Sequence, residues 1–254
     1  MNETSLFDTG MIGILLTGLF LALILMFQLV KRFQQKSVFR ELVPIHRLKR
    51  AIGLAVEAGQ RIHVSIGSGG LVGLEGASGL VGLSLLRRIA RAASISDQPP
   101  IATSGDGVLS VLSQDTLARA HQEAEDDRPM DTTRGQLSGV TPFSYAVGTL
   151  PVILDQNVST TILAGHFGSE AGLILDAAEE KGSVTLGGSD SLTGQAVIYA
   201  VSQNPLVGEE LYASGAYVQA GPAHIASLRA QDVLRWLLVA VILGGAILKF
   251  LGIL

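Results

Sequence analysis

A run of 20 uncharged residues, 11–30, constrains this chain more than any other feature, because only Thr17 and Gln28 within it are notably polar. At a rise of about 1.5 Å per residue, a helix of this length spans the roughly 30 Å hydrocarbon core of a bilayer. A second apolar run covers residues 236–254. We therefore expect one transmembrane helix at each terminus, with a domain between them that is held to a membrane at both ends.

A cleaved signal peptide is the alternative interpretation of the first apolar run. Such a peptide starts with basic residues and ends at a small-residue cleavage site. Here the first ten residues hold Glu3 and Asp8 but no Lys or Arg, and a basic pair follows the run. Residues 31–50 hold seven basic residues against the single acid Glu41. Because basic flanks stay cytoplasmic, we expect a retained anchor, both termini outside the cell and a cytoplasmic domain.

The sequence divides into four parts on this basis. We expect an N-terminal transmembrane anchor over residues 1–30 and a basic juxtamembrane segment over 31–45. A cytoplasmic α/β domain follows over 46–231, and a C-terminal transmembrane helix over 232–254. The expected partners are therefore a lipid bilayer first and soluble ligands second.

The composition excludes several classes of function. The net charge is −4 and aromatic residues make up 5% of the chain, so neither a basic surface nor a base-stacking platform for nucleic acid is expected. Cysteine is absent, which excludes disulfides, Cys-ligated metal sites and thiol nucleophiles. We expect no nucleic-acid partner and no metal site, and the sequence identifies no cofactor.

Between the apolar runs, short β-rich segments alternate with helical segments. This alternation predicts an α/β fold, a parallel Rossmann-like sheet with helices on both faces, flanked by one transmembrane helix at each terminus. Strands are expected at residues 61–66, 101–103, 160–164, 184–186 and 205–207, with a weak edge strand within 132–140. Helices are expected at residues 46–58, 80–93 (with Ser78 as N-cap), 108–124, 142–153, 171–180 and 192–202, and from about residue 224 into the membrane.

Four of the expected strands end in a similar pattern, in which glycine and then a hydroxyl or acidic residue precede a helix. Ligands of open parallel sheets bind outside the carboxyl ends of the strands, where helix N-termini suit phosphate or carboxylate groups. This pattern predicts a site for an anionic small molecule, although the same residues also simply make turns and caps. The candidate ligand-binding residues are Gly67, Ser68, Gly69, Gly70, Ser104, Asp106, His166, Ser169, Glu170, Gly188, Ser189 and Asp190.

Sharper motifs are few. The glycines at 67 and 69 match the start of a G-x-G-x-x-G nucleotide motif, but Val72 stands where the third glycine belongs. Asp106 follows a strand, where an acid can bind a ribose, but a helix cap is the favoured interpretation. His166 with Glu170 is the one pair suited to acid–base chemistry, and it lacks a third partner.

Self-association is also expected. Each apolar run carries a small-xxx-small pair, Gly18 with Ala22 and Ala240 with Gly244, which lets helices approach closely. Segment 71–83 holds more apolar residues than one helix face buries, and such a surplus usually meets a partner. The alternative is that the surplus packs within the monomer or against lipid. Its members are Leu71, Val72, Leu74, Leu80, Val81 and Leu83.

From His46 onward, the sequence resembles an uncharacterised prokaryotic membrane family known only as a domain of unknown function. The similar features are the Gly67-Ser68-Gly69-Gly70 stretch, residues 208–214 and residues 227–232. The resemblance implies a membrane-anchored α/β domain in a prokaryotic cell membrane. It implies no activity, so no catalytic residue is carried over.

Two hypotheses of function remain. The first is a membrane-anchored cytoplasmic scaffold or ligand-sensing module that self-assembles. The second is a membrane-tethered enzyme that acts on a phosphorylated or nucleotide-like small molecule. Missing catalytic motifs favour the first, and the glycine-rich strand ends keep the second open.

Overall fold

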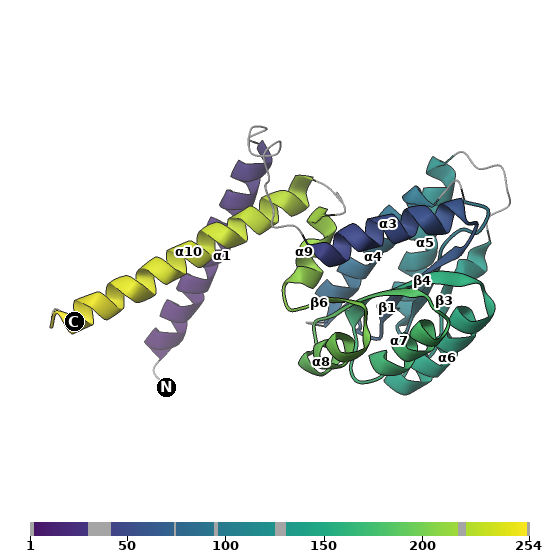
Figure 1. Cartoon of the computed structure of the whole chain (residues 1–254). Helices are drawn as coiled ribbons and strands as arrows, with labels where there is room; N and C mark the ends of the chain where they lie inside the picture. The colour runs from purple at the N-terminus through teal and green to yellow at the C-terminus, as the bar shows by residue number, and fades with distance from the viewer. Residues whose placement is uncertain are drawn as a thin grey trace. The chain divides into compact units, whose positions relative to one another are not determined.

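The computed structural model describes residues 3–29, 42–73, 75–93, 96–124, 131–217 and 222–252 (Figure 1). The chain forms two compact units, one made of Met1–Arg40 with Gly221–Leu254 and the other of Glu41–Ala220. Most of the expected basic segment 31–45 lies outside the described residues.

The larger unit contains a six-stranded sheet in the order β3-β2-β1-β4-β5-β6, and every neighbouring pair is parallel. This 3-2-1-4-5-6 order is that of doubly wound sheets that bind dinucleotides, with the reversal of order between β1 and β4. The predicted parallel α/β sheet is confirmed. The strands are β1 (Arg61–Gly67), β2 (Ile101–Ser104), β3 (Gly135–Leu137), β4 (Val158–His166), β5 (Val184–Ser189) and β6 (Asn204–Leu206).

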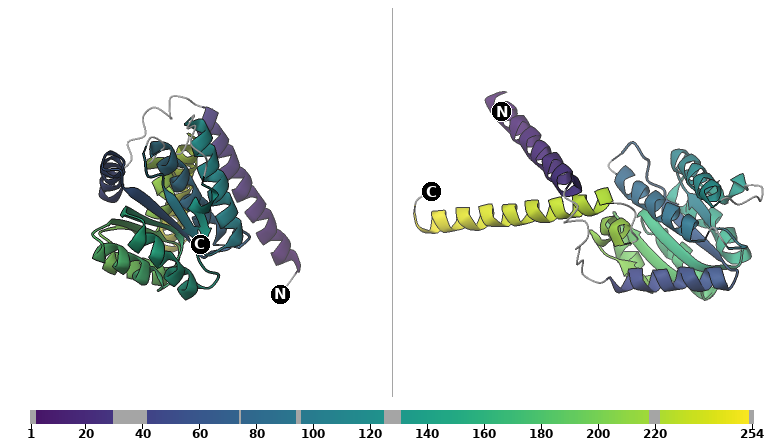
Figure 2. Two further views of the ribbon diagram at one scale, coloured as in Figure 1. Left: turned by 90° about the vertical axis from the view of Figure 1, so that its right-hand side faces the viewer. Right: turned by 90° about the horizontal axis from the view of Figure 1, so that it is seen from above.

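Helices cover both faces of the sheet (Figure 2). One layer comprises α3 (Val43–Glu57), α4 (Gly76–Ala92), α5 (Gly107–Glu123) and α9 (Glu210–Tyr217). The other layer comprises α6 (Pro142–Asp155), α7 (Ala171–Glu180) and α8 (Leu192–Val201).

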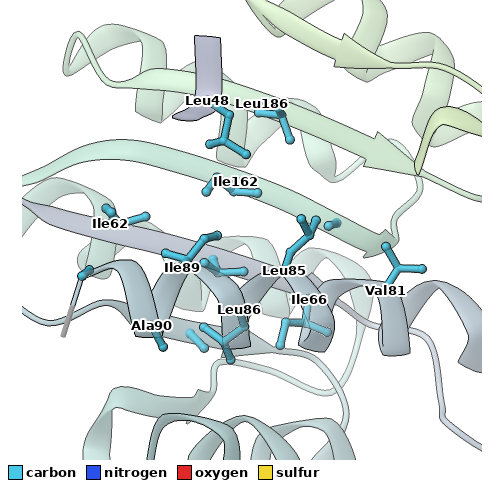
Figure 3. Close-up of a cluster of buried hydrophobic side chains, with 14 of the residues drawn as sticks. Leu48, Ile62, Ile66, Val81, Leu85, Leu86, Ile89, Ala90, Ile162 and Leu186 are labelled. Carbon is cyan, nitrogen blue, oxygen red and sulfur yellow. The ribbon is translucent and has the colours of Figure 1, made fainter. Parts of the chain in front are cut away.

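The main apolar core lies between the sheet and the first layer. Figure 3 shows side chains of α3 and α4 meeting the central strands. Alternate residues of a strand point to opposite faces, so the apolar residues of β1 at 62, 64 and 66 all face this layer. The side chains between them are polar and face α6, as described below.

Glycines let α4 lie directly on the rest of the domain. A Cβ at Gly82 would lie 2.2 Å from the carbonyl oxygen of Ala164 in β4, and one at Gly76 would lie 2.2 Å from that of Leu71. These contacts require glycine at 76 and 82, whereas a Cβ at Gly70 would meet nothing within 4 Å, so the three-residue spacing has no single cause. The structure also corrects one prediction, because α4 starts at Gly76 and buried Ser78 lies inside it, donating to the carbonyl of Glu75 at 2.7 Å.

The start of α6 agrees with the sequence, whereas α9 is an additional helix. Thr141 and Ser144 form a capping box at the start of α6, as the Thr-Pro signature predicts. Helix α9 was not expected. It is too short to show a clear apolar period, and Glu210 stabilises its start by accepting the Val207 N–H at 3.2 Å.

The smaller unit consists of α1 (Glu3–Leu29) and α10 (Pro222–Phe250). They pack through Phe27 against Ala226 and Ala230. A Cβ at Gly18 or at Gly244 would meet nothing within 4 Å, so neither glycine serves this contact.

One described helix, Ile225–Phe250, is long and apolar enough to cross a membrane. This finding corrects the prediction of one such helix at each terminus. The described apolar part of α1 is Gly13–Leu29. At about 1.5 Å per residue it reaches about 25 Å, short of the roughly 30 Å hydrocarbon core.

Candidate functional site

The carboxyl ends of the parallel strands meet at one edge of the sheet, and backbone hydrogen bonds link them. The N–H of Gly105, after β2, donates to the carbonyl of Gly67 at 2.8 Å. The N–H of Ser68, after β1, donates to the carbonyl of His166 at 3.0 Å. The predicted residues at the ends of β1, β2 and β4 therefore lie side by side, at the place where the strand order reverses.

His166 is the centre of the titratable groups at this edge. Its Nδ1 lies 2.8 Å from Oδ1 of Asp190, at the end of β5. Its Nε2 lies 3.6 Å from Oε1 of Glu75, at the start of α4. Burial raises the pKa of the Tyr212 hydroxyl, and the negative charge of Asp190 raises it further. We call His166, Asp190, Glu75 and Tyr212 the His166 cluster.

Two glycines allow the β1–α4 connection to touch His166. A Cβ at Gly69 would lie 2.6 Å from the Cβ of His166 and 3.1 Å from that of Glu75. Gly67 has a φ of +87°, and a Cβ there would lie 2.3 Å from the His166 carbonyl oxygen. Side chains at these positions would displace the histidine, so both glycines are needed to place the cluster.

Acidic residues gather at this edge without Lys or Arg. The connections after the strands, with the first turn of each following helix, contain six carboxylates and no Lys or Arg in the sequence. These segments contain no histidine either, and His166, the last residue of β4, borders them. The acids are Glu75, Asp106, Glu170, Asp190, Glu209 and Glu210.

Several of these acids accept hydrogen bonds from backbone N–H groups of the protein itself. Asp106 accepts the N–H groups of Val108 and Leu109, each at 3.0 Å, so it acts as the cap that the sequence favoured. Glu170 is buried and accepts the N–H of Gly168 at 2.8 Å. A carboxylate at a helix N-terminus offsets the positive end of the helix dipole. The helix starts that would attract a phosphate are thus largely neutralised by the protein itself.

Other predicted residues hold the connections in place. The Ser189 hydroxyl donates to the carbonyl of Phe167 at 2.9 Å and accepts its N–H at 3.1 Å. The Ser104 hydroxyl donates to the carbonyl of Asp106 at 3.2 Å. Ser169 is exposed. Ser68 and Gly70 lie in the β1–α4 connection and are partly exposed.

Two expectations about this edge need correction. Gly188 lies inside β5, because that strand continues to Ser189. A Cβ at Gly188 would lie 3.1 Å from the side chain of Leu211 in α9, so this glycine serves packing. His166 pairs with Asp190 and not with Glu170, whose carboxylate turns inward to the amide of Gly168.

A buried hydrogen-bond network beneath the edge was not predicted. The Tyr145 hydroxyl of α6 accepts the N–H of Gly67 at 3.3 Å, donates to the carbonyl of Thr103 at 3.2 Å and contacts the Ser65 hydroxyl. The Thr103 hydroxyl also contacts Nε2 of His63 at 2.9 Å. Burial lowers the pKa of His63 to about 3, so this imidazole is neutral. Through Tyr145, this network holds the backbone of Gly67 in position.

The sequence offered weak signals for the remaining members of the cluster. Glu75 immediately precedes a helix, and Tyr212 belongs to the stretch 208–214 that carries the family resemblance. Neither position indicates a neighbour of His166 without the register of the sheet. Among the described residues, no group of three or more His, Asp or Glu side chains is placed to hold a metal ion.

The His166 cluster can exchange protons and accept hydrogen bonds. Asp190 can accept a hydrogen bond from Nδ1, which leaves Nε2 as the nitrogen able to exchange a proton or bind a ligand. Glu75, whose side chain is 51% exposed, offers a carboxylate beside it. These groups accept hydrogen bonds and attract positive charge.

Comparison with known proteins gives one match. A family model described as "Domain of unknown function (DUF6754)" matches residues 2–254. No curated protein and no solved structure matches the chain.

Proposed function

The chain belongs to the DUF6754 family, and from this premise we propose that it is a membrane-anchored α/β module that senses a small ligand at the His166 cluster and self-assembles. The observation that carries the proposal is the histidine held between Asp190 and Glu75 where the strand order reverses. Open parallel sheets bind ligands at this point.

The charge of the edge favours a ligand that donates hydrogen bonds, such as a protonated amine. Ionised carboxylates only accept hydrogen bonds. Glu75 and Asp190 flank His166, and the surrounding connections carry no Lys or Arg. A phosphorylated or otherwise anionic ligand, the partner expected from the sequence, would meet these carboxylates without a cation to offset them.

An enzyme remains a second candidate because of one contact. Asp190 lies 2.8 Å from Nδ1 of His166, an arrangement that orients a histidine as a general base through Nε2. An enzyme of this kind would act on an uncharged or cationic substrate, in contrast to the phosphorylated substrate considered above. Turnover of an amine that binds the protein would favour this candidate over sensing.

Membrane anchoring is supported mainly by the C-terminal helix. The segment Ile225–Phe250 of α10 meets the length and hydropathy of a membrane span. Helix α1 is continuous over residues 11–29, nearly all of the first apolar run. The basic residues within 31–50 support a cytoplasmic position for the domain, with both termini outside. A prokaryotic cell membrane is the proposed location.

Self-assembly is supported by two uncharged helix surfaces. Phe143 and Val147 are exposed one turn apart on α6, and Leu192 and Tyr199 are exposed on α8, which has no charged residue. Exposed apolar surfaces of this kind usually meet a partner. The segment 71–83 contributes less than expected. Val81 is buried in the core, and Leu71 and Leu83 are partly buried against it. Val72 and Leu80 are exposed, and Leu74 lies outside the described residues.

A titration of the full-length protein in detergent tests the ligand proposal. The probes are ethanolamine and putrescine, compared with inorganic phosphate and a nucleoside monophosphate, and the readout is calorimetry at constant ionic strength. We expect the amines to bind wild type, and E75Q and D190N to weaken that binding. The matched control is E180Q, an exposed acid at the end of α7. Tighter binding of phosphate, or equal amine binding by E75Q, D190N and E180Q, would refute the proposal.

A further inference from the structure

A concave region that contains no residue of the His166 cluster lies between the start of α3 and the end of α9. It is a cavity of about 300 Å3, at the lower end of the range for small-molecule sites. All of its lining belongs to the larger unit. The lining residues are Leu42, Val43, Ile45, His46, Lys49 and Tyr217. We call this region the α3/α9 pocket.

The pocket combines an apolar wall with the side chains of a lysine and a histidine. Leu42 and Ile45 are buried and form part of the wall. His46 and Lys49 are exposed and stand three positions apart on α3, a spacing that places side chains on neighbouring parts of one helix surface. Among the described residues that line the pocket, none is acidic. A group with a negative head and an apolar chain fits this chemistry.

The start of α3 adds to the positive character of the pocket. Its N-cap is Leu42, whose side chain offers no acceptor, and its first turn contains no acidic residue. The carbonyl of Leu42 accepts the N–H groups of Ile45 and His46, each at 3.1 Å. The positive end of this helix dipole is therefore not offset by an acid in its first turn. By contrast, Asp106 caps α5 and Glu210 stabilises the start of α9.

Chain connectivity links the pocket to the helix that can span a membrane. Tyr217 ends α9, and α10 begins at Pro222. A fully extended link between these two residues reaches at most about 18 Å. Helix α10 includes the candidate span Ile225–Phe250. When that helix crosses a bilayer, the short link keeps the pocket within reach of the lipid headgroups.

We propose that the α3/α9 pocket binds an anionic amphiphile, with its phosphate or carboxylate between His46 and Lys49 and its apolar chain along Leu42 and Ile45. A phospholipid headgroup of the surrounding membrane and a free fatty acid share this chemistry. The assignment is independent of the amine site at the His166 cluster. It places an anion beside the basic side chains of α3, whereas the acidic edge of the sheet meets the start of α9, at the other end of that helix from Tyr217.

Native mass spectrometry of the full-length protein tests the proposal. Protein is released from mixed micelles that contain equal amounts of phosphatidylglycerol and phosphatidylcholine, and retained lipids are counted. We expect wild type to retain phosphatidylglycerol in preference to phosphatidylcholine. In K49E the ratio of retained phosphatidylglycerol to phosphatidylcholine should fall about tenfold, which corresponds to the loss of one charge-assisted hydrogen bond. The matched control is K181E, an exposed lysine that follows α7.

Three further arms complete the test. V43E adds an acid to the first turn of α3 at an exposed position, so it should also reduce retention while the circular dichroism spectrum stays unchanged. Dodecanoate in place of phospholipid reveals whether a free fatty acid is the better occupant, and inorganic phosphate alone should bind much more weakly than either. E75Q should retain phosphatidylglycerol as wild type does, which separates this site from the amine site.

Several outcomes would overturn the proposal. One is that wild type, K49E and V43E retain equal amounts of phosphatidylglycerol. Another is that wild type retains phosphatidylcholine as well as phosphatidylglycerol. A third is that K181E loses as much phosphatidylglycerol as K49E does. Binding of inorganic phosphate as strong as that of both amphiphiles would also overturn it, because the apolar wall would then contribute nothing.

Discussion

The two faces of the sheet are built from different chemistry. Toward α3 and α4, the central strands present Ile62, Val64 and Ile162, which pack into the main apolar core. Toward α6, the same strands present His63 and polar neighbours, joined through Tyr145. Burial of apolar side chains stabilises a fold without requiring a particular orientation. Buried polar groups, in contrast, must form hydrogen bonds of defined geometry. Both faces bury apolar residues, since Leu163 and Phe167 join a smaller apolar cluster with α6, α7 and α8. The larger cluster lies on the first face, and the polar network of the second face fixes the backbone beneath the His166 cluster.

The largest expected effect comes from the close contact of α4 with the sheet. In G82A the new Cβ would start 2.2 Å from the Ala164 carbonyl oxygen, which is rigid backbone. We expect a loss of more than about 3 kcal/mol or failure to fold, because overpacking here must shift a helix and a strand together. Urea unfolding of the full-length protein in detergent measures the effect.

Gly53 of α3 provides the matched control for this helix glycine. A Cβ there would meet nothing within 4 Å, so G53A should be neutral or stabilise the protein by up to about 1 kcal/mol. Similar stabilities for G82A and G53A would show that α4 is not pressed against the sheet.

A core truncation on the apolar face should have the next largest effect. Leu85 is fully buried between α4 and the sheet, so L85A should lose about 2–5 kcal/mol of unfolding free energy. Leu80 lies on the same helix but is 52% exposed, and L80A should change stability by less than about 1 kcal/mol. Equal losses in the two variants would contradict the assignment of the apolar face as the stabilising one.

The polar face should respond differently to a single deletion. Y145F removes the hydroxyl that accepts the Gly67 N–H and donates to the Thr103 carbonyl, so we expect a loss of about 1–3 kcal/mol. Because Gly67 also contacts the His166 backbone, amine binding at the His166 cluster should weaken more than in L85A. Calorimetric titration with putrescine measures this difference.

Tyr199 supplies the control for the loss of a tyrosine hydroxyl. It is 69% exposed on α8, so Y199F should alter neither stability nor amine binding. If Y145F destabilised the protein but bound putrescine as well as Y199F, the polar face would serve stability alone.

Much of the fold was predictable because its signals are local. The bounds of α7, Ala171–Glu180, match the prediction, and Gly182 follows with a φ of +73° as a helix-ending glycine should. Alternation of strands and helices sufficed for the parallel sheet. The start of α4 could not be located in this way, since it depends on how the β1–α4 connection folds back on Gly76 and how closely Gly82 approaches the backbone of β4. The N-terminal apolar run predicted a helix correctly, but its described part is short for a membrane span.

The location of the site could be predicted from the sequence, but the hydrogen-bond partner of His166 could not. Parallel topology alone brings the end of each strand to one edge, so His166 and Asp190 were expected there. Their hydrogen bond depends on side-chain direction, and the sequence suggested Glu170 as the partner instead. The expected anion rested on free helix N-termini. Asp106, for which a helix cap was the favoured interpretation, caps α5, and such acids at the helix N-termini counter an anion.

The smallest expected effect concerns the pH dependence of stability, and it arises on the polar face. Burial lowers the pKa of His63 to about 3 in the folded protein, whereas an unfolded histidine titrates near 6.5. Above about pH 6.5 neither state is protonated at this residue. Below that pH the unfolded state takes up a proton that the folded state does not, so unfolding becomes more favourable as pH falls toward 3.

Between pH 7.5 and 5.5, this difference in proton uptake should cost wild type about 1.4 kcal/mol. The variant H63Q lacks the titrating group, so its stability should fall by about that much less over the same interval, whatever its stability at pH 7.5. Urea unfolding at several pH values measures both slopes. Parallel slopes would mean that His63 is charged or solvated in the folded state. The network from His63 through Thr103 to Tyr145 would then not be the dry, neutral support that distinguishes this face from the apolar one.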